Sequence, residues 1–189
     1  PRKYIWPLRN YDIYRFSKPN NLKNLSLSNG YDAEATVHPK EEKIIFTSLR
    51  NGDIDLYEMD YDGKNLKQIT NKFGYDGGAF YSPDGEKIVW RAWYPQNDKE
   101  RAKWLNNLNN NYIESVPLDI YIANRDGSKQ KRLTNNGATN WSPSWHPSGN
   151  FIVFSSNMDN WIEEYQSYGP NFELYMMEIK TGELYRLTY

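Results

Sequence analysis

The chain has 189 residues, enough for one sizeable core or for several small repeated units that share one. Lysine and arginine together number 23 and aspartate and glutamate 24, so the formal net charge is −1, which argues against nucleic acid as the main partner. The chain has no cysteine, which excludes disulfides and thiolate metal sites.

The remaining composition favours short strands and argues against a membrane helix. Aromatic residues make up 16% of the chain, and Gly, Pro, Asn and Asp recur at short intervals, as in proteins built from many short strands and tight turns. No run approaches the ~18 apolar residues that a membrane helix needs, so we expect no membrane span. The first ten residues, PRKYIWPLRN, contain neither an initiator Met nor an apolar targeting segment, so we expect a processed or truncated chain.

The first strand-like segment covers residues 10–28. Its two runs, YDIYRF at 11–16 and LKNLSLS at 22–28, match the third and fourth strands of a repeat that the rest of the chain contains in full. We therefore predict half of a repeat here.

The full repeat occurs three times, at residues 31–70, 75–134 and 140–188. Each copy predicts four short strands: one that ends at a proline, a wholly apolar second strand, a third with large side chains, and a more polar fourth. The second and third copies carry insertions at the same joint, residues 94–117 and 157–171. The anchors of the register are Pro39, Pro83 and Pro147; Phe46, Trp90 and Phe154; and Thr70, Thr134 and Thr188.

The apolar second strands decide the fold class. Because they have no polar face, each must be covered on both sides. Stacking four-stranded antiparallel blades face to face around an axis provides that cover, so the sequence predicts an all-β propeller with about three and a half blades present. A β-sandwich is the structural alternative, but it requires one polar face per strand and demands no fixed repeat. The three runs are Ile44 to Phe46, Ile88 to Trp90 and Ile152 to Phe154.

The phrases SPDGEKIVW, DIYIANRDGSKQKRLT and GYDAEAT resemble the repeats of the TolB-type propellers, the bacterial WD-like family. The resemblance covers residues 10–189. It implies a six-bladed ring, a periplasmic or otherwise exported location, and action through protein contacts or as a propeller part of a larger enzyme. This chain departs from the family in being short, and an open arc would leave blade faces and strand edges bare. We therefore expect further residues or another chain to complete the propeller.

The order of the strands predicts one functional rim. The links that enter the first strand and those between the second and third lie at the same end of a blade, so both insertions are expected there. Asp32, Asp76 and Asn140, each seven positions before its proline, and Glu34 are expected around the channel mouth. Such a ring can hold a cation or a peptide amine. Alternatively, the Asp and Asn side chains hydrogen-bond neighbouring blade backbones and close the turns.

Both insertions contain helix-capping patterns. In the longer one, Asn97 with Glu100 predicts the start of a short helix, and Asn160 with Glu163 has the same relation in the shorter one. The apolar positions expected on one face of the first helix are Ala102, Leu105 and Leu108.

Aromatic side chains in and beside the insertions suggest a contact surface for a protein or a sugar. The alternative is that they pack down on the blade tops, and a helix would bury Trp104 in this way. The rim aromatics predicted for partner binding are Trp93, Tyr94, Trp161, Tyr165 and Tyr168.

No catalytic motif is present: the sequence has no Gly-x-Ser-x-Gly elbow, no His-Glu-x-x-His and no Gly-rich phosphate loop. His38 and His146 share one repeat position beside a turn, where the second copy has Ser82, so a structural role is favoured. We therefore expect no enzyme activity, cofactor or metal site in this chain, and predict a non-catalytic scaffold that binds a protein or peptide. The alternative is the propeller of a polysaccharide-processing or peptidase enzyme, with its catalytic residues outside this chain.

Overall fold

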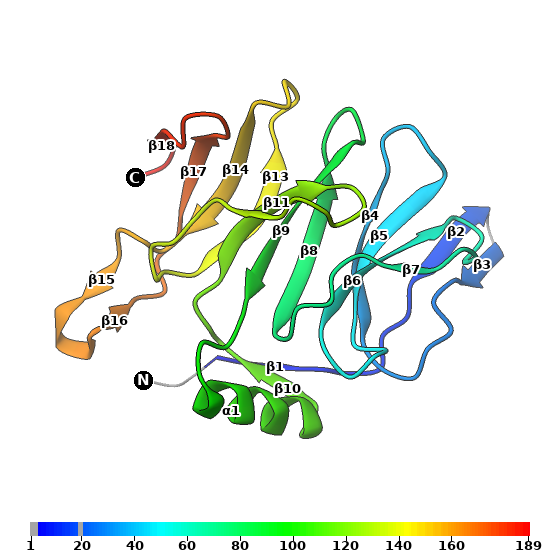
Figure 1. Ribbon diagram of the computed structural model, residues 1–189, viewed down its shortest axis with the longest axis horizontal. Helices are drawn as coiled ribbons and strands as arrows, with labels where there is room; N and C mark the ends of the chain where they lie inside the picture. Colours follow the sequence, from blue (N-terminus) through cyan, green and yellow to red (C-terminus); the bar gives the residue numbers. More distant parts are fainter. Residues whose placement is uncertain (1–3, 19–20) are drawn as a thin grey trace. The chain divides into compact units, whose positions relative to one another are not determined.

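The computed structural model describes residues 4–18 and 21–189, and these are built mainly from β-strands (Figure 1). Within them, three separate four-stranded sheets correspond to the three predicted blades, and a two-stranded sheet corresponds to the predicted half blade. The chain divides into two compact units, which are described one at a time. Unit 1 comprises the residues up to Gly77 and Tyr94–Ser115; unit 2 comprises Gly78–Trp93 and Val116–Tyr189.

Unit 1 holds the half blade and the first blade. The half blade is an antiparallel pair in which Tyr14 lies opposite Asn24, and in the first blade Phe46 lies opposite Tyr57. These paired strands overlap the two runs predicted at residues 11–16 and 22–28. The strands are β2 (Tyr14–Lys18) and β3 (Asn21–Asn24) in the half blade, and β4 (Asp32–Val37), β5 (Lys43–Ser48), β6 (Asp55–Asp60) and β7 (Lys67–Gln68) in the first blade.

Unit 2 holds the third blade and all of the second blade except the start of β8. The apolar runs that begin at Ile88 and Ile152 lie in different sheets, as the stacking of separate blades requires. The strands of the second blade are β8 (Tyr75–Tyr81), β9 (Lys87–Trp93), β11 (Asp119–Asn124) and β12 (Lys131–Arg132). Those of the third are β13 (Asn140–Trp145), β14 (Phe151–Ser156), β17 (Glu173–Glu178) and β18 (Leu184–Arg186).

Sheets pack face to face within each unit. In unit 1, Leu25 and Ile13 of the half blade pack on a buried cluster of the first blade that includes Phe46 and Tyr57. In unit 2, Val89 and Ile120 of the second blade share one buried cluster with residues of the third blade. Burying apolar surface in this way contributes roughly 25 cal/mol per Å². The doubly apolar second strands are thus explained, because each sheet needs a neighbour. The remaining members of the unit 2 cluster are Ile152, Phe154, Tyr175 and Met177.

The first strand of each blade has a residue with positive φ at the same place. Glu34, Gly78 and Ser142, each five positions before the anchor proline, all have positive φ, at 58°, 63° and 50°. In β4 and β13 the pairing register shifts at this point, which is the signature of a β-bulge. At Gly78 a side chain is also excluded by space, because a Cβ would lie 1.7 Å from an Arg91 guanidinium nitrogen.

The two insertions form small elements of their own. The first contains helix α1 (Asp98–Asn109) and β10 (Tyr112–Glu114), which pairs with β1 (Ile5–Pro7) near the start of the chain. The second is a hairpin of β15 (Trp161–Ile162) and β16 (Ser167–Tyr168), with the short 3-10 helix η1 (Glu163–Tyr165) between them.

Candidate functional site

The channel-mouth residues Asp32 and Asp76 lie buried at the starts of their strands in unit 1. Asp32 accepts a hydrogen bond from the Ser28 hydroxyl and pairs with Arg50, whose Nη2 lies 3.0 Å from Oδ1. Asp76 accepts a hydrogen bond from the hydroxyl of Tyr94 at 2.7 Å. Both are occupied by contacts within the protein.

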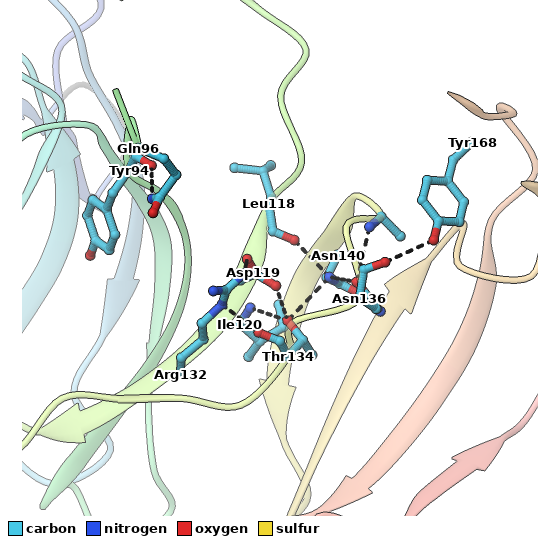
Figure 2. A network of polar contacts seen from close by, with 11 residues as sticks. Tyr94, Gln96, Leu118, Asp119, Ile120, Arg132, Thr134, Asn136, Asn140 and Tyr168 are labelled. Carbon is cyan, nitrogen blue, oxygen red and sulfur yellow. Dashed lines mark hydrogen bonds and ion pairs between the residues drawn. The ribbon is translucent and has the colours of Figure 1, made fainter. Parts of the chain in front are cut away.

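Asn140 holds the same position in unit 2 and is also buried. Its side-chain amide donates to the carbonyl oxygen of Leu118 at 2.8 Å and to Oδ1 of Asn136 at 2.9 Å (Figure 2). The same amide nitrogen also donates to the hydroxyl oxygen of Thr134, at 3.3 Å. Asn140 therefore ties the opening of the third blade to the second.

The backbone repeats this tie in every copy. The N–H groups of Asp32, Asp76 and Asn140 each donate to the carbonyl oxygen of a residue that lies shortly before the third strand of the preceding blade. The alternative interpretation, in which the Asp and Asn side chains hydrogen-bond the backbone of the neighbouring blade, holds for Asn140, whereas the contacts described above for Asp32 and Asp76 are to side chains. The acceptors of the backbone N–H groups are Tyr11, Ile54 and Leu118, at 2.9 Å in each case.

Glu34 differs from the other channel-mouth residues because it is only partly buried. Its Oε2 accepts a hydrogen bond from the Thr47 hydroxyl at 3.0 Å. Its role in ligand binding stays a prediction.

A repeated set of side-chain hydrogen bonds, which we call the clasp, links the third and fourth strands of every copy, and the repeat in the sequence marked only its threonines. A hydroxyl at the end of the fourth strand accepts a hydrogen bond from the third-strand backbone and donates to the acidic residue that precedes that N–H. In the second blade, the Thr134 hydroxyl lies 2.9 Å from both Ile120 N and Asp119 Oδ1 (Figure 2). The hydroxyls belong to Ser26, Thr70, Thr134 and Thr188, and the acids are Asp12, Asp55, Asp119 and Glu173.

A side chain two positions before the hydroxyl residue completes each clasp by pairing with the acid. Burial and, to a smaller extent, the nearby carboxylate of Asp53 together raise the pKa of Asp55 to about 6. Burial also raises the pKa of Asp119, although the Thr134 hydroxyl and Arg132 oppose the shift. The side chains that pair with the acids are Asn24, Gln68, Arg132 and Arg186.

The first insertion is fastened to unit 1 by a buried tryptophan. Asn97 caps α1 as predicted, with Oδ1 accepting from Glu100 N at 2.9 Å. The predicted apolar face is wrong in part: Ala102 and Leu105 are exposed, and the buried residues of the helix are Trp104, Asn107 and Leu108. The helix contacts the blade through the large indole ring of Trp104, a position that the predicted apolar face did not include.

Trp104 also makes the polar contact that fixes the helix. Its indole N–H donates to Oδ1 of Asp53 at 2.8 Å, and Asp53 further accepts from the backbone N–H groups of Ile54 and Gly74. Burial raises the pKa of Asp53 despite these three hydrogen bonds. The expected burial of Trp104 is confirmed.

Two of the predicted rim aromatics, Trp93 and Tyr94, are less exposed than expected. Tyr94 is buried beneath Lys72, whose Nζ lies 3.8 Å from the ring centroid, and Trp93 is partly buried. The prediction that Tyr94 offers an open contact surface is wrong, because its ring is covered and its hydroxyl is held by Asp76.

The second insertion is an anchored hairpin. The side chain of Asn157 accepts from Thr139 N and donates to the carbonyl oxygen of Gly169, both at 2.8 Å. The Tyr168 hydroxyl donates to the carbonyl oxygen of Asn136 at 2.9 Å (Figure 2). The predicted cap at Asn160 is not formed, because η1 begins after Ile162 and has no side-chain cap.

Two aromatic rings of this hairpin are exposed: Trp161 keeps 48% of its surface and Tyr165 keeps 53%. The Trp161 ring packs edge-on against Tyr168, with centroids 5.1 Å apart, and its N–H donates to Glu163 at 2.9 Å. Hydrogen bonds from Trp161 and then Gln166 lower the pKa of Glu163, so its carboxylate stays ionised. We call Trp161, Glu163, Tyr165 and Tyr168 the aromatic hairpin.

Both histidines accept hydrogen bonds from the backbone of the turns that follow them. Nδ1 of buried His38 accepts from the backbone N–H groups of Lys40 and Glu41, and Nδ1 of exposed His146 accepts from Ser148 N. These contacts agree with the structural role favoured from the sequence.

Comparison with known proteins gives no match to a family model and none to a curated protein. Solved structures do match. TolB from Acinetobacter baumannii matches with a TM-score of 0.69 and 18% identity over 99% of this chain and 41% of its own. The chain has the fold of a β-propeller.

Other propeller structures extend the comparison to proteins with different roles. A puromycin-hydrolyzing peptidase of Mycobacterium tuberculosis matches with a TM-score of 0.67 and 13% identity, over 100% of this chain and 29% of its own. A chain of a nidogen/laminin complex matches with a TM-score of 0.59 and 12% identity, over 98% and 61%. This chain thus spans about half or less of the TolB structures that it matches.

Two negative findings apply to the propeller residues at 4–18 and 21–189. No helix among them is both long and apolar enough to span a membrane. Within the same residues, no three His, Asp or Glu side chains lie close enough together to hold a metal ion.

Proposed function

We propose that this chain is a non-catalytic binding scaffold that engages a protein or peptide partner through the aromatic hairpin. The observation that carries the proposal is the exposure of Trp161 and Tyr165 on a hairpin whose base is fixed by hydrogen bonds. Large amphipathic rings that are held in place lose little conformational entropy on binding, which is why they dominate binding surfaces.

The charge of the hairpin suggests the chemistry of the partner. Residues 157–171 contain Asp159, Glu163 and Glu164 and no lysine or arginine. Asp159 is already paired with Arg186, whereas the carboxylates of Glu163 and Glu164 are exposed beside the rings. Exposed rings beside carboxylates suit a segment rich in lysine or arginine, because a cation gains from both the ring face and the carboxylate.

The test compares peptides of equal length that differ only in charge, one rich in lysine and arginine, one rich in glutamate and one neutral. Fluorescence anisotropy should show binding of the basic peptide, with an affinity that falls as salt screens the carboxylates. Trp161→Ala with Tyr165→Ala should weaken binding at least about tenfold.

Leu105→Ala, at an exposed position of the other insertion, is the control and should bind as the wild type does. Equal affinity of the double variant and the wild type for the basic peptide would overturn the proposal.

An enzyme propeller is the second candidate function, and the match to the puromycin-hydrolyzing peptidase favours it. Here the chain supplies only a propeller, and the catalytic residues lie outside these 189 positions. Screening the wild type against uronate-containing glycans and the peptide set separates the candidates, because selective glycan binding would favour a polysaccharide-processing enzyme. An exported location is part of the proposal and rests on the sequence resemblance alone.

A further inference from the structure

Three Asn-Gly pairs occur in the chain, and their asparagines are Asn29, Asn51 and Asn136. An asparagine that precedes glycine can lose its side-chain amide without an enzyme, because glycine has no Cβ to keep its backbone nitrogen away from the asparagine side chain. The reaction requires that the side-chain amide turns towards this nitrogen and that the nitrogen loses its proton. Hydrogen bonds that hold either group therefore slow the reaction.

The pair at Asn136 is held through its side chain. Oδ1 accepts hydrogen bonds from Asn140 Nδ2 at 2.9 Å and from Ala138 N at 3.2 Å, and Nδ2 donates to Asn140 Oδ1 at 3.2 Å (Figure 2). All three contacts must break before the Asn136 side chain can rotate towards the nitrogen of Gly137. These contacts protect this pair.

The pair at Asn51 is held at both reacting groups. Asn51 Nδ2 donates to Gln68 Oε1 at 3.0 Å, and the N–H of Gly52 donates to the carbonyl oxygen of Leu49 at 2.9 Å. The nitrogen that would react is thus already the donor of a turn hydrogen bond. The Asn51 side chain is exposed, so these contacts, rather than burial, protect this pair.

The pair at Asn29 lacks both kinds of restraint. Within residues 4–18 and 21–189, neither the Asn29 side chain nor the N–H of Gly30 makes a hydrogen bond. Gly30 has a φ of 143°, and a Cβ added there would meet no atom within 4 Å. The Asn29 side chain is exposed, so hydroxide and water reach it. The structure therefore leaves this pair the most reactive of the three.

We propose that Asn29 is a site of spontaneous deamidation, and that the reaction loosens the contact between the half blade and the first blade. The nitrogen of Gly30 loses its proton to hydroxide and attacks Asn29 Cγ. The new N–Cγ bond forms as the Cγ–Nδ2 bond breaks, and Nδ2 takes a proton from water and leaves as ammonia. Water then opens the cyclic imide at either carbonyl carbon, which gives aspartate or isoaspartate at position 29. This site is distinct from the aromatic hairpin, and the inference goes beyond the proposed function.

The isoaspartate product would act on the contact between the two sheets. Its backbone runs through the former side chain, so an additional carbon lies directly before Gly30, whose carbonyl oxygen accepts from Tyr11 N at 3.2 Å. Two residues further on, Asp32 N donates to the carbonyl oxygen of Tyr11 at 2.9 Å. Lengthening the link therefore displaces the acceptor of the Tyr11 N–H.

Peptide mapping by mass spectrometry tests the proposal on the 189-residue chain, incubated at mildly alkaline pH either folded or in guanidinium chloride. In the folded chain, Asn29 should convert at least about tenfold faster than Asn136, because three contacts restrain Asn136. Asn51 should also convert more slowly than Asn29. In guanidinium chloride the three pairs should convert at similar rates, because no structure restrains them.

Two outcomes of the mapping overturn the proposal. The first is a folded chain in which Asn51 or Asn136 converts as fast as Asn29. The second is the same order of rates in guanidinium chloride, because local sequence rather than structure would then decide which pair reacts.

Asn29→Gln is the matched control, because the longer side chain closes a cyclic imide far more slowly. Amide hydrogen exchange at Tyr11 should accelerate in the incubated wild type and stay unchanged in incubated Asn29→Gln. Freshly prepared Asn29→Asp introduces the charge without the additional backbone carbon and should exchange like fresh wild type. Unchanged exchange at Tyr11 in chains that contain isoaspartate at position 29 would overturn the proposed loosening.

Discussion

At the scale of single residues, the clasp explains why a hydroxyl residue ends each copy, a threonine in the three full repeats and Ser26 in the half blade. The hydroxyl of Thr70 lies 2.9 Å from Leu56 N and 3.1 Å from Asp55 Oδ1. Replacing Thr70 with valine keeps the shape but leaves the buried N–H and the carboxylate without this partner. The free energy of unfolding in urea should fall by about 1–3 kcal/mol.

Thr188→Val is the matched control for that prediction. Thr188 makes the same backbone contact, to Leu174 N at 2.8 Å, but it is exposed, and water can replace the lost hydroxyl. Its cost should be clearly smaller than that of Thr70→Val. Equal costs would show that the burial of the clasp contributes nothing.

The raised pKa of Asp55 predicts a dependence of stability on pH. The folded pKa of about 6 exceeds the unfolded value near 3.8, so the folded protein binds the proton more tightly than the unfolded chain. The stabilisation that Asp55 contributes is complete below pH ~4 and is lost as the pH rises through about 6. Asp55→Asn removes this titration, because an amide does not ionise in this range.

Urea unfolding at several pH values checks the prediction. The free energy of unfolding of the wild type should fall relative to that of Asp55→Asn between pH ~4 and ~7. The difference between the two proteins matters, because other carboxylates titrate in both. A difference that is constant with pH would contradict the raised pKa.

At the scale of elements, helix α1 depends on one tryptophan. Trp104→Phe keeps most of the buried ring but removes the N–H that binds Asp53. Because the hydrogen bond joins a charged group, its loss should cost about 1.5–3 kcal/mol. Amide hydrogen exchange should accelerate within Asp98–Asn109, since the contact anchors the helix.

Leu105→Ala is the control for the helix, because Leu105 belongs to α1 and is exposed. Its exchange pattern should match that of the wild type. If Trp104→Phe left helix exchange unchanged, apolar packing alone would hold α1 in place.

The strands were more predictable from the sequence than the insertions. The position of each blade strand follows from the proline, aromatic and threonine anchors, because the same local sequence pattern occurs in all three full copies of the repeat. The insertions have no such repetition. The cap at Asn97 formed as the local pattern predicted, whereas Asn160, with the same spacing, caps nothing, because the chain there pairs as a hairpin.

The candidate site was harder to predict than the fold for the same reason. The sequence identified Asp32, Asp76 and Asn140 as a repeated set, but spacing could not show that tertiary contacts bury them. Likewise, Tyr94 and Trp161 are both aromatic residues of insertions, yet one is buried and the other exposed. Exposure depends on which neighbour covers a ring, and that neighbour is remote in sequence.

At the scale of the whole molecule, the same substitution at one repeat position should change the free energy of unfolding by different amounts in two blades. Val89 and Val153 are counterparts in the pairing with β11 and β17, but Val89 is fully buried between sheets and Val153 is only partly buried. Val89→Ala removes two buried methyl groups and leaves a cavity, so unfolding should become easier by about 2 kcal/mol.

Val153→Ala should cost less than about 1 kcal/mol in the monomer, because its methyl groups are only partly removed from water. Urea unfolding measures both values. A cost for Val153→Ala that equals that of Val89→Ala would show that the side chain of Val153 is packed as well as that of Val89.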